Sequence, residues 1–346
     1  IAWRQRFPFR LTLSLDDSGS KATGKLQGGI TVSHDHMLTL NDLFYVSFNQ
    51  DVGNGASGAR GTRGHTVHYS VPWGYWLLGL NASEFDYHQA VAGINQTYLY
   101  SGESDSQEIR LSRLVYRDAV QKTTVHLRGW ARGSRNFIDD TEVRVQRRQV
   151  AGWGLGVAHR LFVGSAVLDG SLAYRRGTGA MDALSAPEEP FGEGTSRMQL
   201  LTADLGLDMP FKLGDARMRY LGAWRGQWNY TPLVPQDRFS IGGRYTVRGF
   251  DGETVLSAER GWLLRNDLGL LLGASGGEAY LGIDYCEVAG PPSDLLPGKR
   301  LAGAVIGLRG GYKGVSYDFF LGEPIKKPTG FRTASTAAGF RLGVSF

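Results

Sequence analysis

Residues 335–346 read STAAGFRLGVSF and carry the clearest structural signal in the chain. Phe340, Leu342, Val344 and Phe346 occupy every second position, and the residues between them are small or polar. A period of two is the spacing of a β-strand whose two faces meet different surroundings. The end of the chain is therefore predicted to be a strand with one apolar face and a terminal aromatic residue.

The same alternation recurs along the sequence and predicts sixteen strands. The opposite positions carry many bulky charged residues, and tight turns at 162–165 and 273–277 alternate with long loops. Short turns on one rim and long loops on the other are typical of an outer-membrane barrel, which has an even number of strands. The predicted strands are 3–15, 22–34, 41–52, 63–72, 75–87, 96–117, 121–135, 142–160, 165–176, 196–210, 216–229, 259–272, 277–287, 301–312, 314–323 and 335–346. The predicted long loops are 51–64, 175–195, 230–258, 288–300 and 323–334.

These features predict an all-β fold, a 16-stranded antiparallel transmembrane β-barrel that forms a single domain over residues 1–346. The alternative is a large soluble β-protein, which also alternates apolar and polar residues. The charged inner face and the terminal aromatic strand favour the barrel. A barrel of this size has an open lumen unless a segment of the chain fills it.

The composition is compatible with this fold and excludes several classes of protein. The 346 residues include 49 glycines and one cysteine, Cys286, so no disulfide forms within the chain. The sequence contains no run of about 18 apolar residues, so it predicts no transmembrane helix. The net charge is +5 and the basic residues are spread through the sequence, so we expect no nucleic-acid partner.

The sequence contains no strong candidate for a metal-binding, phosphate-binding or catalytic site. His34, Asp35 and His36 lie at a strand end and offer no complete coordination set, so a solvated turn is the better interpretation. The glycine-rich stretch 273–277 lacks the lysine of a phosphate-binding loop. No constellation of serine, histidine and aspartate stands out. We therefore expect no catalytic residue, no metal and no cofactor, and we do not expect an enzyme.

The longest loop, residues 230–258, contains the segment IGGRYTVRGFDGE at 241–253. A loop of this length is functional or disordered. Ile241, Tyr245, Val247 and Phe250 suit burial better than exposure to water. Gly249 beside an arginine suits a tight turn that presents one side chain. These residues predict a loop that folds into the barrel.

The strand at 277–287 offers this loop a partner. Leu281, Ile283 and Tyr285 alternate with Asp284, so an apolar face toward lipid places Asp284 toward the lumen. Arginine and aspartate form bidentate pairs that fix direction as well as distance. We predict that Arg248 holds Asp284. The alternative is an exposed loop whose arginine meets only water.

The segment RYTVRGFDGE resembles the VRGY/F signature in the sixth extracellular loop of the two-partner secretion outer-membrane transporters (TpsB family). This family belongs to the superfamily that includes the BamA barrel-assembly proteins. The signature falls on Val247, Arg248, Gly249 and Phe250. The flanking stretches GQWNYTPLVPQDRFSIGG and ERGWLLRNDL also resemble the family, and the resemblance extends over essentially the whole chain.

A second family signature, (F/G)-x-D-x-G on a later strand, resembles the stretch LGIDYCE. Gly282 and Asp284 are in register with it, whereas Cys286 stands where the family has its final glycine. The resemblance implies the same tether of Arg248 to Asp284, and it implies that the terminal Phe346 acts as an assembly signal.

The resemblance also implies a function in the Gram-negative outer membrane. It implies a pore that translocates a large partner exoprotein (TpsA type: an adhesin, haemolysin or contact-dependent toxin) to the cell surface without ATP. The expected partners are this exoprotein, outer-membrane lipid and lipopolysaccharide, and the barrel-assembly machinery, and the expected state is a monomer. Family members also carry a plug helix and two periplasmic POTRA domains, which we expect this chain to lack. A BamA-like insertase and a passive porin-like channel are the alternatives.

Overall fold

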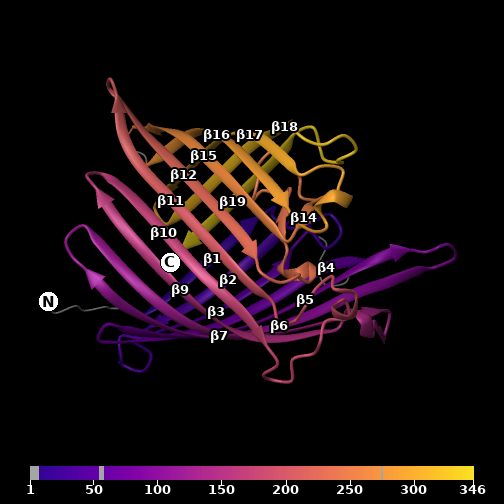
Figure 1. The fold of residues 1–346 in the computed structure, drawn as a ribbon. Coiled ribbons are helices and arrows are strands. Elements are labelled where there is room, and N and C mark those ends of the chain that lie inside the picture. The colour runs from indigo at the N-terminus through magenta and orange to yellow at the C-terminus, as the bar shows by residue number, and fades with distance from the viewer. Residues whose placement is uncertain (1–7, 54–57, 274–275) are drawn as a thin grey trace.

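The computed structural model describes residues 8–53, 58–273 and 276–346, which form a closed antiparallel barrel of sixteen long strands (Figure 1). This arrangement confirms the predicted all-β, sixteen-stranded architecture. The strands are β1 (Phe9–Asp16), β2 (Gln27–Asp35), β3 (Leu43–Asp51), β4 (Arg60–Trp73), β5 (Trp76–Ala92), β6 (Thr97–Arg117), β7 (Gln121–Ile138), β9 (Arg148–Val163), β10 (Ala166–Thr178), β11 (Gln199–Leu213), β12 (Ala216–Asn229), β15 (Arg260–Leu272), β16 (Gly277–Ala289), β17 (Arg300–Tyr312), β18 (Val315–Lys326) and β19 (Ala337–Ser345).

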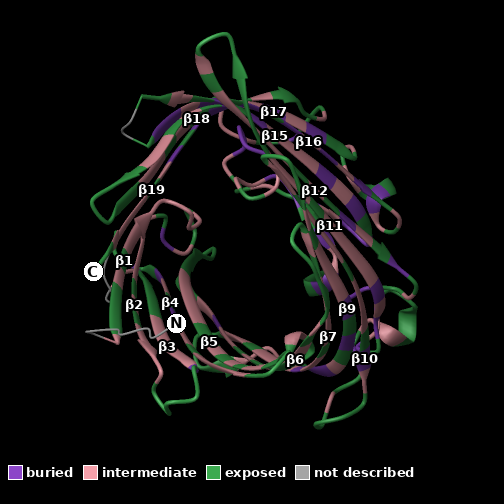
Figure 2. Cartoon of the chain, turned by 90° about the vertical axis from the view of Figure 1, so that its left-hand side faces the viewer, coloured by how far each residue is buried: buried purple, intermediate pink, exposed green. Residues whose placement is uncertain are grey.

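Pairing between the first and last strands closes the barrel. Each long strand pairs with its neighbours along the chain, and β1 pairs with β19 from Thr12 opposite Ser345 to Asp16 opposite Arg341. Figure 2 shows the resulting ring, with β1 beside β19. A closed ring leaves no unpaired strand edge, which is the condition for a sheet to span a lipid bilayer.

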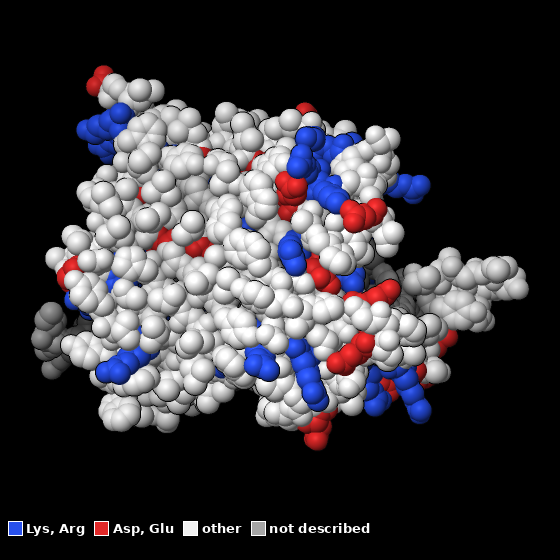
Figure 3. All heavy atoms as spheres, viewed as in Figure 1, with Lys and Arg blue, Asp and Glu red and all other residues white. Residues whose placement is uncertain are grey.

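The register between strands keeps apolar side chains on one face of the whole sheet. Val344 lies opposite Leu13, which lies opposite Ile30 and then Phe48 on the next strands. Ile30 and Phe48 are exposed, and such side chains on the outside of a closed barrel face lipid. Charged side chains are sparse across the middle of the wall in Figure 3. No helix in the described parts of the chain is long and apolar enough to cross a membrane.

The two rims of the barrel differ in the length of their connections. One rim has tight turns, including the predicted turn at 162–165, where Gly164 takes a left-handed backbone with φ of 61°. The other rim has longer loops at 179–198, 230–259, 290–299 and 327–336. Short turns are periplasmic and long loops extracellular in barrels of this kind, so we expect the same assignment of the two rims here. The predicted turn 273–277 falls partly outside the described residues.

Several predicted strand boundaries were wrong by a few residues. The strand predicted at 142–160 begins at Arg148, because β8 (Thr141–Glu142) extends the preceding hairpin and Arg144–Gln146 forms a 3₁₀ turn. The strand predicted at 3–15 is described only from β1 onward, since residues 1–7 lie outside the described residues. The strand predicted at 63–72 begins earlier, at Arg60.

The long connection between β12 and β15 contains a small hairpin that the sequence did not predict. Strand β13 (Phe239–Ile241) pairs with β14 (Leu256–Ala258), with Ile241 opposite Leu256. Strands of three residues are too short for alternation to reveal. Residues 242–255, which join β13 to β14, are called the tip segment below.

Candidate functional site: a loop arginine bound to the barrel wall

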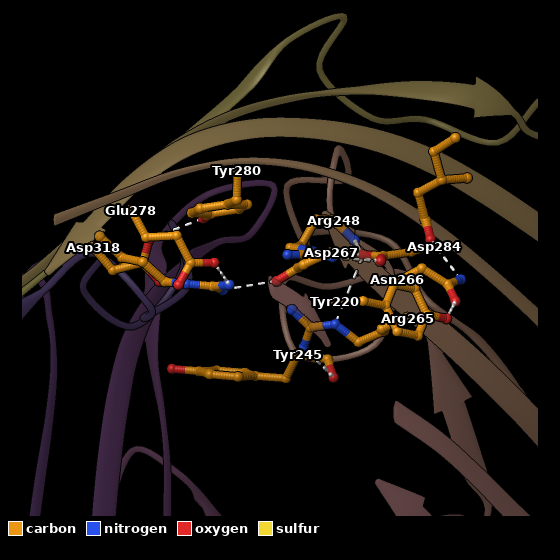
Figure 4. A network of polar contacts seen from close by, with 12 residues as sticks. Tyr220, Tyr245, Arg248, Arg265, Asn266, Asp267, Glu278, Tyr280, Asp284 and Asp318 are labelled. Atoms are coloured by element: carbon orange, nitrogen blue, oxygen red, sulfur yellow. Dashed lines mark hydrogen bonds and ion pairs between the residues drawn. The ribbon is translucent and has the colours of Figure 1, made fainter. Parts of the chain in front are cut away.

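Arg248 of the tip segment binds a carboxylate on the barrel wall. Its Nε and Nη2 atoms donate to Oδ2 and Oδ1 of Asp284 on β16 at 2.7 and 2.6 Å (Figure 4). Its backbone amide also donates to Oδ2 of Asp284, at 2.8 Å. Asp284 is completely buried and Arg248 is only 4% exposed. Three hydrogen bonds between two residues fix the orientation of the arginine, and the structure places this pair out of contact with water.

A second wall carboxylate, Asp267 on β15, contacts the same guanidinium. Nη2 of Arg248 lies 2.5 Å from Oδ1 of Asp267, and Nη1 of Arg309 on β17 lies 2.7 Å from its Oδ2. Arg309 also lies 2.5 Å from Glu278 on β16, so positive and negative groups alternate across the wall. Each buried charge therefore has an opposite neighbour, which offsets the cost of its removal from water. A Cβ on Gly282 would lie 2.7 Å from Nη2 of Arg248, so this glycine leaves space for the guanidinium.

The charge state of Arg248 follows from these contacts. Burial alone would lower the pKa of its guanidinium, but the carboxylates of Asp284 and Asp267 raise that pKa above its ordinary value. The guanidinium therefore stays charged at any physiological pH.

Glycines allow the backbone of the tip segment to lie directly on the wall. A Cβ on Gly303 of β17 would lie 1.9 Å from the carbonyl oxygen of Arg248, and a Cβ on Gly322 of β18 would lie 2.8 Å from the amide nitrogen of Gly249. Gly249 has a φ of 95°, and a Cβ there would lie 2.5 Å from the carbonyl oxygen of Glu323. The opposing atoms are all backbone atoms, so a side chain at any of these glycines would displace the segment.

Apolar residues surround the arginine on the tip segment. Val247 and Phe250 are buried, and the ring of Phe250 meets Phe331 edge-on at 5.8 Å. The prediction that Tyr245 is buried was wrong, because its side chain lines an open cavity and is exposed. Cys286, which replaces the glycine of the family signature, lies in the same cluster and donates through Sγ to the carbonyl oxygen of Leu301 at 3.6 Å. The other buried members of this cluster are Phe239, Ile241, Leu256, Ala258, Leu263, Val288, Leu301 and Phe331. The cluster excludes solvent from the ion pair, which strengthens its electrostatic interaction.

The tip segment also contacts the place where the first and last strands meet. Nη1 of Arg244 lies 2.6 Å from Oδ1 of Asp17, and Nη2 of Arg244 donates to the carbonyl oxygen of Phe340 on β19 at 3.4 Å. Asp251 accepts a hydrogen bond from Thr333 at 3.1 Å. The segment is therefore held by the loops after β1 and β18 as well as by the wall at β15 to β18.

A polar cavity of about 760 Å³ lies beside the tip segment, on the inner face of the wall. Tyr245 lines it, and the carbonyl oxygen of Tyr245 accepts a hydrogen bond from Arg265 at 3.4 Å. Arg225 pairs with Asp204 at 2.6 Å across this cavity wall. Basic residues outnumber acidic ones in the lining, which includes Arg110, Lys122, Arg160, Asp169, Asp204, Arg225 and Arg265. Such a lining accommodates water and polar backbone.

The structure brings together the predicted residues Val247, Arg248, Gly249, Phe250, Gly282 and Asp284. Phe346 lies apart from them on the rim that carries the tight turns, where its backbone amide donates to the carbonyl oxygen of Leu11 at 2.9 Å. Asp35 pairs with Arg10 at 2.8 Å, and the described residues contain no group of three or more candidate metal ligands.

Sequence reasoning missed Asp267, Arg309 and the wall glycines 303 and 322. Alternation does place Asp267 on the inner face, because Leu268 and Leu270 are exposed on the other face. It does not reveal which inner carboxylate the tip segment meets. The sequence also does not show which wall glycines matter, since the role of a glycine depends on the backbone that approaches it.

Comparison with known proteins shows the family to which the chain belongs. The model of the haemolysin secretion/activation proteins ShlB/FhaC/HecB matches residues 1–310. The outer membrane transporter CdiB-2 of Burkholderia pseudomallei is 38% identical over 343 residues, which are 98% of this chain and 59% of that protein. The hemolysin transporter protein ShlB of Serratia marcescens is 25% identical and covers 81% of this chain and 50% of its own length.

Solved structures agree with these relatives. CdiB from Acinetobacter baumannii superposes with a TM-score of 0.85 and 33% identity, covering 98% of this chain and 60% of that one. CdiB from Escherichia coli gives a TM-score of 0.92 at 23% identity, over 99% and 64% of the two chains, which shows a shared fold. The chain thus spans about 60% of the length of such relatives. It is an integral outer-membrane β-barrel and belongs to the ShlB/FhaC/HecB family of haemolysin secretion/activation proteins.

Proposed function

We propose that this barrel is the pore through which a large partner exoprotein crosses the outer membrane in two-partner secretion. The main support for this proposal is the match to an outer membrane transporter at 38% identity over 98% of the chain. The charged cavity on the inner face supports it, because an extended polypeptide exposes peptide groups that need polar surroundings.

In this proposal the tip segment is folded into the lumen and is part of the pore wall. Arg248 anchors it through Asp284, and the wall glycines let it lie flat against β17 and β18. Removing one partner of a buried ion pair costs about 3–5 kcal/mol because the other charge is left uncompensated, so loss of either residue is expected to release the segment from the wall. Loss of the anchor would leave a segment of the loop free in the path of the exoprotein.

Transport in this proposal makes and breaks no covalent bond. The protein therefore acts without a catalytic residue, a cofactor or ATP, and folding of the exoprotein outside the cell favours outward movement. Recognition of the exoprotein falls to periplasmic POTRA domains of the kind that family members carry.

We further propose how the barrel reaches and sits in the membrane. Phe346 is the residue that the barrel-assembly machinery recognises, and its exposed ring leaves it available for that contact. One chain closes the pore by itself, so the working state is a monomer surrounded by outer-membrane lipid and lipopolysaccharide.

Two alternatives predict different behaviour in cells. A BamA-like insertase would support the assembly of other barrels, but the similarity to BamA from Haemophilus ducreyi is one of fold alone, with 13% identity and a TM-score of 0.64. A porin-like channel would pass small solutes and no protein.

The test is a secretion assay with the full-length protein and its exoprotein partner carrying an epitope tag. Cells with the protein are expected to release the tagged partner into the medium, and cells without it to retain the partner in the periplasm. Equal release in both strains would reject the proposal. A fall in the levels of unrelated outer-membrane barrels without the protein would favour the insertase alternative.

A further inference from the structure

The outer wall of the barrel contains a hollow that neither the tip segment nor the pore uses. This cavity of about 770 Å³ is lined almost entirely by apolar groups. Its main lining follows two neighbouring rows of residues that lie opposite one another across β4, β5, β6, β7, β9 and β10. The first row is Val67, Ala82, Gln107, Ala131, Ala151 and Thr178, and the second is Tyr69, Leu80, Ile109, Gly129 and Trp153. We call this cavity the outer groove.

The outer groove faces lipid and not the lumen. Val67, Leu80, Ile109 and Trp153 belong to the exposed apolar set, and adjacent residues such as Glu108 point to the inner face, where Glu108 pairs with Arg128 at 2.8 Å. The occupant of the groove must therefore be largely hydrocarbon.

The groove marks the extracellular edge of the apolar wall. The next row toward the long loops carries His65, Glu84, Asp105 and Gln149, which are polar. The hydrocarbon of the outer leaflet therefore meets the headgroups at this height, and a lipid in the groove has its headgroup beside the rim.

Small side chains make the wall hollow here. Ala82, Gly129, Ala131 and Ala151 form the floor, and Tyr69 and Trp153 stand at the sides. Six strands at a spacing of about 4.8 Å give the groove a length of roughly 24 Å, which suits an extended acyl chain.

Two arginines without acidic partners lie at the β10 end of the groove. Arg176 extends the second row, opposite Trp153, and Nη2 of Arg197 lies 3.4 Å from the position of a Cβ on Gly179, which is adjacent to the lining residue Thr178. Neither side chain has a hydrogen bond or ion pair with any residue that the structure describes.

Two other outward arginines near the groove are paired with carboxylates. Arg135 lies 3.5 Å from Glu103, and Nε of Arg147 donates to Glu142 at 2.6 Å. On the part of the groove formed by β5 and β6, the adjacent row carries the carboxylates of Glu84 and Asp105. This asymmetry favours an anionic headgroup at the β10 end alone, where two guanidinium groups can bind one phosphate.

We propose that the outer groove binds a phosphorylated, acylated glycolipid of the outer leaflet, of the lipid A type. One acyl chain lies in the groove and a phosphate is held by Arg176 and Arg197. The site is separate from the tip segment and from the cavity beside it, so lipid binding and secretion can be tested independently.

The test is native mass spectrometry of the full-length protein in detergent, titrated with bisphosphorylated lipid A and, separately, with phosphatidylglycerol. The wild-type protein is expected to retain lipid A in preference to phosphatidylglycerol. The double variant Arg176→Gln/Arg197→Gln is expected to bind lipid A at least about tenfold more weakly, since each lost arginine removes a charge-assisted hydrogen bond. A filled groove, Ala82→Leu/Ala131→Leu, is expected to weaken binding to a similar extent.

Matched variants on the far side of the barrel control for general effects. Arg300→Gln removes an outward arginine that is paired with Glu287 at 3.1 Å, and Ala304→Leu enlarges a side chain on the outer face of β17. Both are expected to bind lipid A as the wild type does. Unchanged binding in the arginine double variant would overturn the proposal. Equal losses in the far-side controls would also overturn it, as would phosphatidylglycerol binding as tightly as lipid A through the same arginines.

Discussion

The carbonyl oxygen of Arg248 lies 1.9 Å from the position that a Cβ on Gly303 would occupy. The loop residue and the wall glycine are therefore in direct backbone contact. The opposing atom cannot rotate away as the end of a side chain could, because Arg248 is also held by its amide and its guanidinium on Asp284. This contact makes the glycine as much a part of the anchor as the ion pair.

Gly303→Ala is accordingly expected to lift the tip segment from the wall. The substitution should increase labelling of a Val247→Cys probe, which is completely buried when the segment is in place, by a water-soluble maleimide and lower secretion several-fold. Gly311→Ala on the same strand is the control, since a Cβ there would make only an ordinary contact at 3.5 Å. Equal labelling and secretion in the two variants would show that the close approach is not needed.

Arg248→Lys is expected to behave more like Arg248→Ala than like the wild type. An ammonium group cannot make the two parallel bonds to Asp284 and reach Asp267 as well, so at least one charge-assisted bond of about 1.5–3 kcal/mol is lost. Arg225→Lys is the control, because its pair with Asp204 is exposed and contributes little. The measurement is the amount of exoprotein released at equal levels of inserted barrel. Release at the wild-type level in Arg248→Lys would argue against a role for the bidentate geometry.

The orientation of the barrel can be tested by labelling intact cells. In a Cys286→Ala background, Leu295→Cys in the loop after β16 is expected to react with a membrane-impermeant maleimide. Lys313→Cys in the turn after β17 is expected to react only after the outer membrane is opened. Because Cys286 is completely buried, the parent protein should give no background signal. Reaction of Lys313→Cys from outside would reverse the assignment of the two rims.

Assembly is expected to depend on the ring of Phe346. Phe346→Ala keeps the backbone bond to Leu11 and removes only an exposed side chain, so its effect reports recognition and not closure of the barrel. We expect several-fold less inserted barrel. Phe191→Ala, which truncates an equally exposed phenylalanine in a long loop, is expected to insert normally. If the two variants inserted equally well, the terminal aromatic residue would not be the signal.

Strand positions could be predicted from the sequence because a membrane barrel imposes its period on every strand. Each strand must turn one face to lipid, so Leu281, Ile283 and their counterparts identify the register locally. The boundaries near Arg148 were less certain, because hairpins that extend beyond the membrane no longer have to alternate.

The anchor was only partly predictable. Arg248 and Asp284 could be linked because one is in a loop too apolar to be free and the other is an inward carboxylate. Asp267 and Gly303 are brought to Arg248 by the shear between strands and by the path of the tip segment. Neither quantity can be read from alternation alone.

Arg248 and Asp284 are expected to hold the tip segment, and secretion is expected to require this anchor. The most direct test measures exoprotein release from cells with Arg248→Ala, Asp284→Ala and both changes, normalised to the amount of inserted barrel. Each single change is expected to lower release at least about tenfold, since it leaves a buried charge unpaired. The double variant is expected to be no worse than the more severe single variant, because an interaction that is already lost cannot be lost twice. Wild-type release from Arg248→Ala, or losses that multiply in the double variant, would show that secretion does not depend on the pairing of Arg248 with Asp284.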